Sequence, residues 1–408
     1  MSRLLTCHRA IPHEQLFPRV RFLAVGRWRS SESTFLCNVY RSALLVTASW
    51  MFTDTRLLVN ADHEAPPQPK TLTTSTEPAP AVSGRVVAVP TNRLKYADVG
   101  INLSDDVYRG KYHGKQVHED DTEYVLQRAV EAGCIKLMVT GSDLEESKKA
   151  LKIAEEHRSL CYATVGVHPC SANTFDTHPG GPSKLLQELE RLALEAKERG
   201  IAIAFGEIGL DYDRLFLTGK EQQLKYFEAQ LEIAVKVQLP LFLHSRAAGE
   251  DFERLLKARL PHLPRRGLVH SFTGTTDEMK SLVVLGLDIG VNGCSMKTEE
   301  SLDVVRAIPL ERLQIETDGP WCEMRPSHAS AKYNVGAPLL PKVVKKEKWE
   351  AGCMVKGRTE PATISHVVHA IAKVKGMSIE EVCEAVWNNS IQMFGLGERT
   401  HHEVVPPS

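Results

Sequence analysis

Two carboxylates and two imidazoles lie directly after short apolar runs in the second half of the chain. Glu207 follows AIAFG, His244 follows LPLFL, His270 follows GLV and Asp318 follows LQIET. Imidazole nitrogens and carboxylate oxygens are ligands for divalent metal ions. A bound divalent ion can lower the pKa of water enough to supply a nucleophile at neutral pH. We therefore predict that these four residues bind metal, and that Glu207 and Asp318 also take part in catalysis.

Three further side chains lie near these ligands or in an equivalent position. Arg246 lies two residues after His244, on the same face of an extended segment, where its guanidinium could hold a phosphate through two hydrogen bonds. His168 ends the apolar run YATVGV and is predicted to contact substrate. Glu316 faces the same way as Asp318, and we group it with the substrate-binding residues as support for the site or for a bound phosphate.

The elements that must position these residues alternate from Tyr96 onwards. Eight apolar runs are separated by segments of helical period. The runs are YADVGINL, CIKLMVTG, CYATVGVHP, IAIAFGE, LPLFLHSR, RGLVHSF, LDIGVNG and RLQIETD. Strands that are apolar throughout belong to a parallel sheet buried on both faces. We predict an α/β fold, a (β/α)8 barrel of the TIM type, with its functional groups at the carboxyl ends of the strands. Two final helices, between 361 and 395, are expected to close its bottom and side.

Composition divides the chain into four regions. Residues 1–63 form a leader that is basic and poor in acids, and its first 59 residues hold eight Arg, no Lys and three acids. Such a leader is typical of a disordered segment or of a mitochondrial presequence. Residues 64–95 are rich in Pro, Ser and Thr, which predicts a flexible linker. Residues 96–395 are the predicted barrel, and residues 396–408 are a tail.

Overall composition is that of a globular protein with a sizeable core. The 408 residues are 42% hydrophobic and 25% charged, and the formal net charge is −1, so no global basic charge indicates a nucleic-acid partner. Nine cysteines without a CxxC pair indicate reduced thiols in an intracellular protein. No apolar run reaches the length of about 20 residues that a membrane helix needs. We expect a cytoplasmic or nuclear protein, or a mitochondrial one if the leader is a targeting sequence. The sequence does not fix the oligomeric state, and a monomer is plausible.

The motifs around the predicted site resemble one family along the whole predicted barrel. They are YADVGINLSDDVYRG, GVHP, GEIGLDYDR, LHSR, HSFTGT, NGCSMKT and IETDGPWCEMRPSHASAKY. These segments resemble those of the TatD family of metal-dependent deoxyribonucleases, in particular its eukaryotic branch, over residues 96–395. The resemblance implies an amidohydrolase-like barrel that hydrolyses phosphodiester bonds in DNA with divalent metal ions. The metal ligands that it implies are Glu207, His244, His270 and Asp318.

The first predicted strand departs from the pattern of many relatives, which carry two histidines there. The matching positions are Gly100 and Asn102. Glycine has no ligating side chain, and a neutral amide oxygen suits Mg²⁺ or Mn²⁺ better than Zn²⁺. We therefore expect one firm metal position beside a weaker one, which Asp318, Glu207 and Asn102 would frame and a substrate phosphate would complete. Asn102 is accordingly grouped with the substrate-binding residues. Gly319 stands where alanine is usual, and it is expected to add backbone freedom after Asp318.

The resulting prediction is a hydrolase of ester bonds, a deoxyribonuclease that uses Mg²⁺, or alternatively Mn²⁺ or Zn²⁺, in DNA degradation or repair. DNA is the expected partner, and a membrane is not. A barrel mouth admits a single strand more easily than a duplex, so a 3′→5′ exonuclease on single-stranded or frayed ends is favoured, also by the resemblance. Two alternatives remain. One is a D-aminoacyl-tRNA deacylase or another metal-dependent hydrolase on the same barrel, and the other is a DNA-binding protein with weak catalysis.

Overall fold

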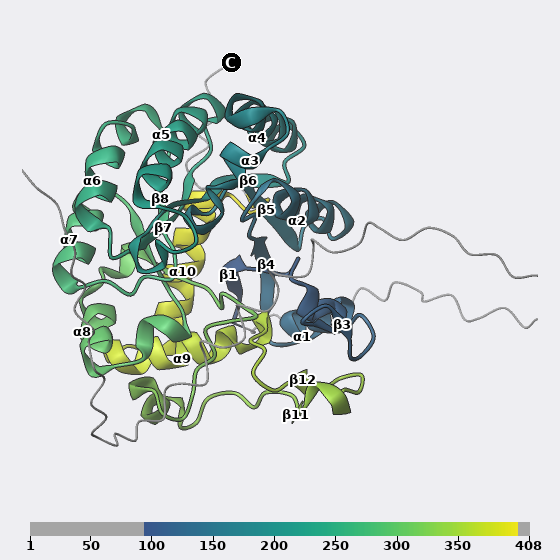
Figure 1. Cartoon of the computed structure of the whole chain (residues 1–408). Coiled ribbons are helices and arrows are strands. Elements are labelled where there is room, and N and C mark those ends of the chain that lie inside the picture. Colours follow the sequence, from purple (N-terminus) through teal and green to yellow (C-terminus); the bar gives the residue numbers. More distant parts are fainter. Residues whose placement is uncertain (1–93, 399–408) are drawn as a thin grey trace, which may run out of the picture. The chain divides into compact units, whose positions relative to one another are not determined.

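The apolar runs become eight parallel strands. A computed structural model describes residues 94–398, so the predicted leader, nearly all of the predicted linker and residues 399–408 lie outside the described residues. The strands pair in the order β1-β4-β5-β6-β7-β8-β9-β10 (Figure 1). Their bounds are β1 (Tyr96–Ile101), β4 (Cys134–Val139), β5 (Cys161–Val165), β6 (Ala202–Asp211), β7 (Leu241–Arg246), β8 (Gly267–Val269), β9 (Asp288–Val291) and β10 (Leu313–Ile315). The predicted (β/α)8 fold is confirmed, whereas the division of the chain into four regions stays a prediction.

The first and last strands meet at the carboxyl end of the barrel. The backbone N–H of Asp318 donates to the carbonyl of Gly100 at 2.8 Å, and the N–H of Asn102 donates to the carbonyl of Gly319 at 2.8 Å. These hydrogen bonds join the segment after β10 to the end of β1. Closure of the barrel therefore depends on the residues that flank the predicted ligand Asp318.

Helices separate the strands and cover the outside of the barrel (Figure 1). Their bounds are α1 (Thr122–Glu131), α2 (Leu144–Glu156), α3 (Thr174–Thr177), α4 (Gly181–Glu198), α5 (Lys220–Val237), α6 (Gly249–Lys257), α7 (Thr276–Val284), α8 (Glu299–Ala307), α9 (Ile364–Lys375) and α10 (Ile379–Phe394). Local capping explains where several begin. Asp143 accepts a hydrogen bond from the N–H of Glu146 ahead of α2, and Ser378 and Glu381 form a capping box ahead of α10. No helix among residues 94–398 is long and apolar enough to cross a membrane.

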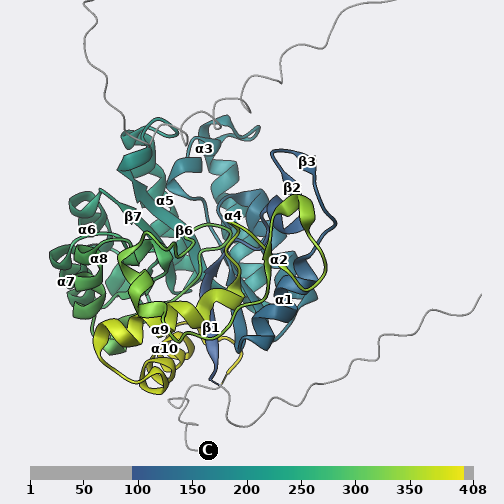
Figure 2. The same ribbon diagram turned by 90° about the horizontal axis from the view of Figure 1, so that it is seen from below.

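The last helix closes the amino-terminal end of the barrel. One cluster of buried side chains joins the barrel interior to the end of α10. It includes Val99, Phe242, Leu268, Ile391 and Phe394. Asn389 of the same helix donates from Nδ2 to the carbonyls of Leu310 and Leu313, both at 2.8 Å. Figure 2 shows α9 and α10 together on this side of the molecule, which agrees with the position predicted for them.

The segment of residues 339–360, which follows the last barrel strand, packs against α1 and a small hairpin. The short strands are β2 (Lys111–Tyr112) and β3 (Lys115–Gln116), which are antiparallel, and β11 (Val343–Val344) and β12 (Met354–Val355), which are parallel. Trp349 stacks on His118 with ring centroids 5.1 Å apart, and its Nε1 donates to Asp121 at 3.0 Å. Arg358 forms buried ion pairs with Asp121 at 2.6 Å and with Glu360 at 2.8 Å. This network anchors the 339–360 segment to the barrel.

Candidate functional site

One oxygen of Glu207 is the meeting point of three imidazoles. Glu207 Oε1 lies 2.7 Å from Nε2 of His270, 2.9 Å from Nδ1 of His244 and 3.3 Å from Nε2 of His168. The four residues come from β6, β7 and the segments directly after β5 and β8. The structure thus brings three of the four predicted metal ligands together. It adds His168, which was predicted to contact substrate, to the same group.

Strands β6 and β7 continue past the ligands that they carry. Glu207 lies inside β6 and His244 lies inside β7, so the prediction that these two residues end their strands is wrong. The pairing extends until Asp211 lies opposite Arg246. These extra residues raise one wall of the barrel mouth above the imidazoles. His270 directly follows β8, as predicted.

Asp211 is a buried carboxylate that the sequence prediction missed. Its Oδ2 lies 3.2 Å from Nε2 of His244, so it holds this ring from the side opposite Glu207. Burial raises the pKa of Asp211, but the hydrogen bond with His244 and the charges of Arg214 and Arg246 lower the pKa overall. A carboxylate behind a ligating histidine fixes the orientation of the ring. The two acids lie four residues apart in one strand, and hence on one face, which is a pattern that could have revealed Asp211.

Glu316 supports His270 in a similar way. Its Oε2 lies 3.5 Å from Nδ1 of His270, and its Oε1 accepts hydrogen bonds from Nδ2 of Asn292 at 3.2 Å and from the N–H of Ser271. Glu316 is 0% exposed. The predicted support of the site fits this position. A direct contact between Glu316 and substrate does not, because the carboxylate has no exposed surface.

Gly100 leaves the space that Glu316 occupies. A Cβ at position 100 would overlap Oε2 of Glu316 and would lie 3.3 Å from Cζ of Phe242. A side chain at this position would therefore require the Glu316 carboxylate to shift. The missing histidine of the first strand is coupled in space to an acid on the last strand.

Asp318 lies beside the imidazole group. Its Oδ1 accepts a hydrogen bond from Nδ2 of Asn102 at 3.0 Å, and its Oδ2 accepts from Sγ of Cys322 at 3.2 Å and from Oγ of Ser271 at 3.4 Å. Within residues 94–398 it has no hydrogen bond to an imidazole. Burial raises the pKa of Asp318 to about 6. Asp318 and Asn102 are in contact, and their shared role as a second, looser metal position stays a prediction.

Gly319 is required by its neighbours. A Cβ there would lie 2.5 Å from Oη of Tyr108 and 2.6 Å from the carbonyl oxygen of Thr359. Those two atoms form a hydrogen bond of 2.6 Å that ties the 339–360 segment to the short 3-10 helix Asp106–Arg109 after β1. The expectation that Gly319 adds backbone freedom stays a prediction. Close packing alone accounts for the absence of a side chain.

The electrostatics of the group fit a divalent cation. Burial raises the pKa of Glu207, but the charges of His270 and His168 hold it well below its usual range. Burial lowers the pKa of His270, but Glu207 and Glu316 raise it well above its usual range. The carboxylates thus attract positive charge to the imidazoles. Ligand atoms of His168, Glu207 and His244 lie within 4.8 Å of one another, close enough to share one ion.

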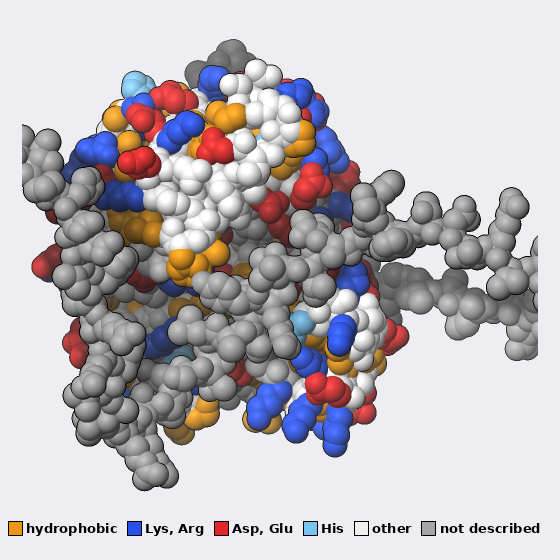
Figure 3. All heavy atoms as spheres, viewed as in Figure 1, with side chains coloured by type: hydrophobic (Ala, Val, Ile, Leu, Met, Phe, Trp, Pro, Cys, Tyr) orange, Lys and Arg blue, Asp and Glu red, His pale blue; other side chains and the backbone are white. Residues whose placement is uncertain are grey.

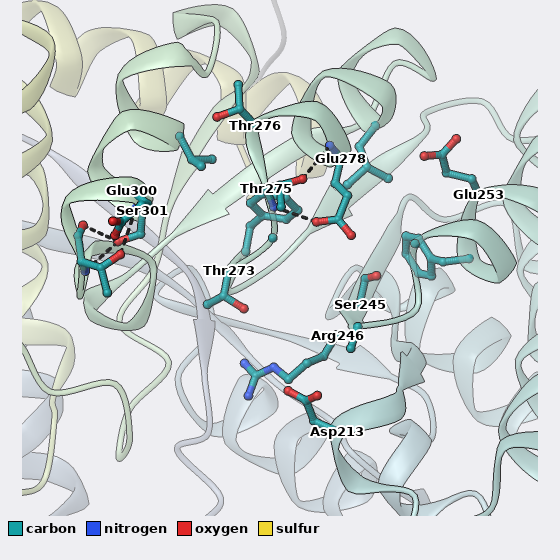
Figure 4. A pocket seen from close by; sticks show the side chains of 18 residues that line it. Asp213, Ser245, Arg246, Glu253, Thr273, Thr275, Thr276, Glu278, Glu300 and Ser301 are labelled. Carbon is teal, nitrogen blue, oxygen red and sulfur yellow. Dashed lines mark hydrogen bonds between the residues drawn. The ribbon is translucent and has the colours of Figure 1, made fainter.

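A cavity of about 600 Å³ is lined by Arg246, two residues after His244, but by none of the predicted metal ligands. It lies between the loops after β6, β7 and β8 and the beginning of α8. Figure 4 shows the Arg246 side chain extending beside Asp213 and Thr273. The hydroxyls of Ser245 and Thr275 also line the cavity. Arg246 is half-buried, and its side chain has no hydrogen bond or ion pair to another described residue, so its guanidinium is available to an anion.

Two aromatic rings are exposed on loops that follow ligand-bearing strands. Trp321 is 55% exposed, and its N–H donates to the carbonyl of Asp318 at 3.1 Å. Phe216 is 72% exposed and lies five residues after Asp211. The sequence prediction did not single out either ring. Exposed rings beside a nucleic-acid site can stack on unpaired bases.

Charged side chains of both signs are interspersed over much of the described surface in Figure 3. Lys and Arg gather near the lower right of that view, over the part of the molecule that holds β11 and β12. The 339–360 segment carries Lys342, Lys345 and Lys348 with exposed side chains. A local basic surface thus exists although the net charge of the chain is −1.

Comparison with known proteins gives one consistent result. A family model described as TatD related DNase matches residues 98–395. "Deoxyribonuclease Tat-D" of Schizosaccharomyces pombe is 49% identical over 301 residues, which cover 74% of this chain and 96% of that protein. "3'-5' ssDNA/RNA exonuclease TatD" of Erwinia amylovora is 33% identical over 302 residues, with 73% and 99% covered. A solved structure of a TatD family hydrolase from Entamoeba histolytica has a TM-score of 0.68 and 36% identity, with 74% and 98% covered.

Proposed function

Because the chain belongs to the family of TatD-related DNases, and is therefore a hydrolase of the nuclease class, we propose that it removes nucleotides from the 3′ ends of single-stranded or frayed DNA with the help of divalent metal ions. One observation carries the proposal. Three imidazoles converge on Oε1 of Glu207 at the barrel mouth, and Arg246, two residues after His244, has no side-chain hydrogen bond or ion pair within residues 94–398. A metal site beside a phosphate-binding group is what phosphodiester hydrolysis requires.

Glu207, His168, His244 and His270 are the proposed holders of one ion. A divalent ion supplies acidified water and neutralises charge on the scissile phosphate. Three imidazoles suit Zn²⁺ or Mn²⁺ better than Mg²⁺, whereas the oxygen donors of Asp318 and Asn102 suit Mg²⁺ or Mn²⁺. Mn²⁺ is therefore the ion that both positions would accept, and the Mg²⁺ favoured by the sequence suits only the second.

The remaining side chains would bind and orient the substrate. Arg246 would hold a non-bridging phosphate oxygen, and Asp318 would accept the proton of the attacking water. The cavity of about 600 Å³ beside Arg246 would take the terminal nucleotide. Trp321 and Phe216 would stack on unpaired bases, which favours single strands over duplex.

The test is digestion of oligonucleotides labelled at the 5′ end, after chelation and return of Mg²⁺, Mn²⁺ or Zn²⁺. We expect a ladder of products shortened from the 3′ end, faster on single strands than on blunt duplex, and no products without metal. His244→Ala and Asp318→Ala should each abolish cleavage while the circular dichroism spectrum is retained. Full activity in both variants would refute the site, and internal cuts or shortening from the 5′ end would refute the direction.

A parallel assay separates the alternative substrate. D-aminoacyl-tRNA and the oligonucleotide are incubated with the same metal-loaded protein. Release of the amino acid with no change in the oligonucleotide would replace the nuclease proposal by the deacylase. Cleavage of the oligonucleotide alone supports the nuclease.

A further inference from the structure

Two thiols on neighbouring loops of the barrel mouth are in direct contact. The Sγ atoms of Cys322 and Cys294 lie 2.6 Å apart, although the residues are 28 positions apart in sequence. Cys322 lies in the loop after β10, and Cys294 lies in the short 3-10 helix η5 (Gly293–Met296) after β9. Both side chains are only partly buried, so solvent reaches them. Between residues 94 and 398, no other pair of sulfur atoms makes such a contact.

The backbone enforces this contact. Gly293 has no Cβ, and one placed there would overlap the carbonyl oxygen of Cys322 and lie 3.0 Å from Cγ of Met324. Cys322 has a φ of 55°, in the left-handed region that residues with a side chain rarely adopt. The side chain of Asn292 accepts a hydrogen bond from the N–H of Cys294 at 2.8 Å and fixes η5. The close approach of the two loops therefore brings the two cysteines side by side.

The surroundings of Cys294 change its acidity. The contact with Cys322 and the charge of Lys297 lower the pKa of Cys294 to about 6, against the effect of burial. A lower pKa favours the thiolate, which is the nucleophilic form of cysteine. An accessible thiolate beside a second thiol is the arrangement found at cysteines that respond to oxidants.

We propose that Cys294 and Cys322 are a peroxide-responsive pair that closes into a disulfide at the mouth of the active site. The Cys294 thiolate attacks one oxygen of a hydroperoxide, the O–O bond breaks, and a sulfenic acid and a hydroxide or alkoxide form. Cys322 then attacks the sulfenic sulfur, the S–O bond breaks, and water leaves with the proton of Cys322. The two thiols lose two electrons in total, and the peroxide gains them. The sulfur atoms need to approach by only about half an ångström to reach a disulfide length of about 2.05 Å.

Closure would change the surroundings of Asp318. Sγ of Cys322 lies 3.2 Å from Oδ2 of Asp318, so its one S–H is shared between Asp318 and Cys294, and a disulfide has no S–H to donate. The loop after β10 would also be tied to η5. Since Asp318 is a proposed catalytic residue, we expect oxidation to slow the reaction and a thiol reductant to restore it. The slowing rests on the proposed function, whereas formation of the disulfide does not.

The test uses the full chain, first reduced and then treated with graded doses of hydrogen peroxide. Linked peptides are identified by mass spectrometry without reduction, and nuclease rates are measured on the same samples. We expect the peptide with Cys294 to be joined to the peptide with Cys322 at the lowest effective dose. The rate should fall about tenfold, the size expected for one lost hydrogen bond to a charged group, and dithiothreitol should reverse both changes.

Two variants complete the test, each compared with its own reduced rate. Cys294→Ser should form no linked peptide and should resist the peroxide dose that slows the wild type. Cys170→Ser is the matched control, because Cys170 is also partly buried and contacts Asp211 at 3.7 Å but has no thiol partner. It should respond as the wild type does.

Three outcomes would overturn the proposal. The first is oxidation of other thiols without a link between Cys294 and Cys322. The second is equal inhibition of wild type and Cys294→Ser, and the third is a linked protein that keeps its full rate. A protein that cleaves no DNA under any condition would refute the proposed function alone, because the linked peptide is detected without an activity assay.

Discussion

His244 and His270 each lie between two buried carboxylates. His244 contacts Glu207 through Nδ1 and Asp211 through Nε2, and His270 contacts Glu207 through Nε2 and Glu316 through Nδ1. One acid is thus shared at the centre and one stands behind each ring. If the inner nitrogen of a ring bound a cation, the outer nitrogen would keep its proton and point its N–H towards the outer acid. The outer acids therefore fix the orientation of the two rings, and with it the position of the nitrogens that would bind metal.

Asp211→Asn tests this arrangement. We expect metal affinity to fall about 10–100-fold, because an amide neither carries the charge nor fixes the ring as a carboxylate does. The measurement is a calorimetric titration with Mn²⁺. Asp213→Asn is the control, since this exposed acid two residues later contacts no imidazole and should keep the wild-type affinity. Equal affinities in all three proteins would show that Asp211 does not support the metal site.

Gly100→Ala tests the coupling between the first and last strands. The added methyl group would push Oε2 of Glu316 aside in a fully buried place, which should cost about 1–3 kcal/mol of unfolding free energy. Affinity for Mn²⁺ should fall as well, because Glu316 would no longer support His270. Gly219→Ala is the matched control, because a Cβ at position 219 would lie no closer than 3.9 Å to another atom, Oε1 of Gln222. Urea unfolding measures both variants, and equal stability would show that the site accommodates a side chain at position 100.

Among the elements, the strands and helices could be predicted because their periodicity is local. Each apolar run reports burial on both faces of a strand, and capping residues such as Ser378 report where a helix begins. The same local patterns placed Glu207, His244 and His270 at one end of the barrel. They did not report that β6 runs on to Asp211, since the ladder to β7 that extends it is formed between distant segments.

The sequence also did not reveal the packing between distant segments around Asp318. Tyr108 and Thr359 lie 251 positions apart, and their hydrogen bond fills the space beside Gly319. No pattern near Gly319 reports these neighbours. The contact of Cys294 with Cys322 is a third example, because scattered single cysteines in a sequence look alike.

The 339–360 segment depends on a buried ion network, and Arg358→Met tests it. The change leaves Asp121 and Glu360 as buried charges with one partner fewer, which should cost about 3–5 kcal/mol of unfolding free energy. Arg325→Met is the control, because its pair with Glu323 is exposed and should contribute at most about 1 kcal/mol. Urea unfolding distinguishes them, and similar stabilities would mean that the buried network contributes little.

The same segment presents lysines that could bind the DNA strand outside the catalytic centre. The double variant Lys345→Glu, Lys348→Glu should bind a long single strand more weakly, and the slope of log affinity against log salt should become shallower by about one per lysine. Cleavage of a dinucleotide should be unaffected. Lys148→Glu, Lys152→Glu on α2 is the matched control. An equal loss of affinity in both double variants would show that the lysines of the 339–360 segment do not form a specific DNA-binding surface.

For the whole molecule, metal binding and folding should be linked. The proposed donors come from separate barrel strands, so only the folded chain gathers them. Mn²⁺ at about 100 times its dissociation constant should add about 2.7 kcal/mol to the unfolding free energy. The measurement is thermal unfolding with and without the ion. His244→Ala should lose the shift, and His262→Ala, whose exposed side chain is outside the group, should keep it. A shift in His244→Ala as large as in the wild type would place the ion elsewhere.

The helix that closes the barrel is also the last part of it to be synthesised. Every residue of the proposed centre, from Asn102 to Asp318, leaves the ribosome before α10 does. Until then the floor of the barrel, which includes Val99 and Phe242, has nothing to cover it. Exposed apolar surface of this kind is what makes a nascent chain aggregate or bind chaperones. A premature stop after Lys375 would therefore leave all the proposed ligands in a chain that is lost to aggregation or proteolysis before it can meet DNA.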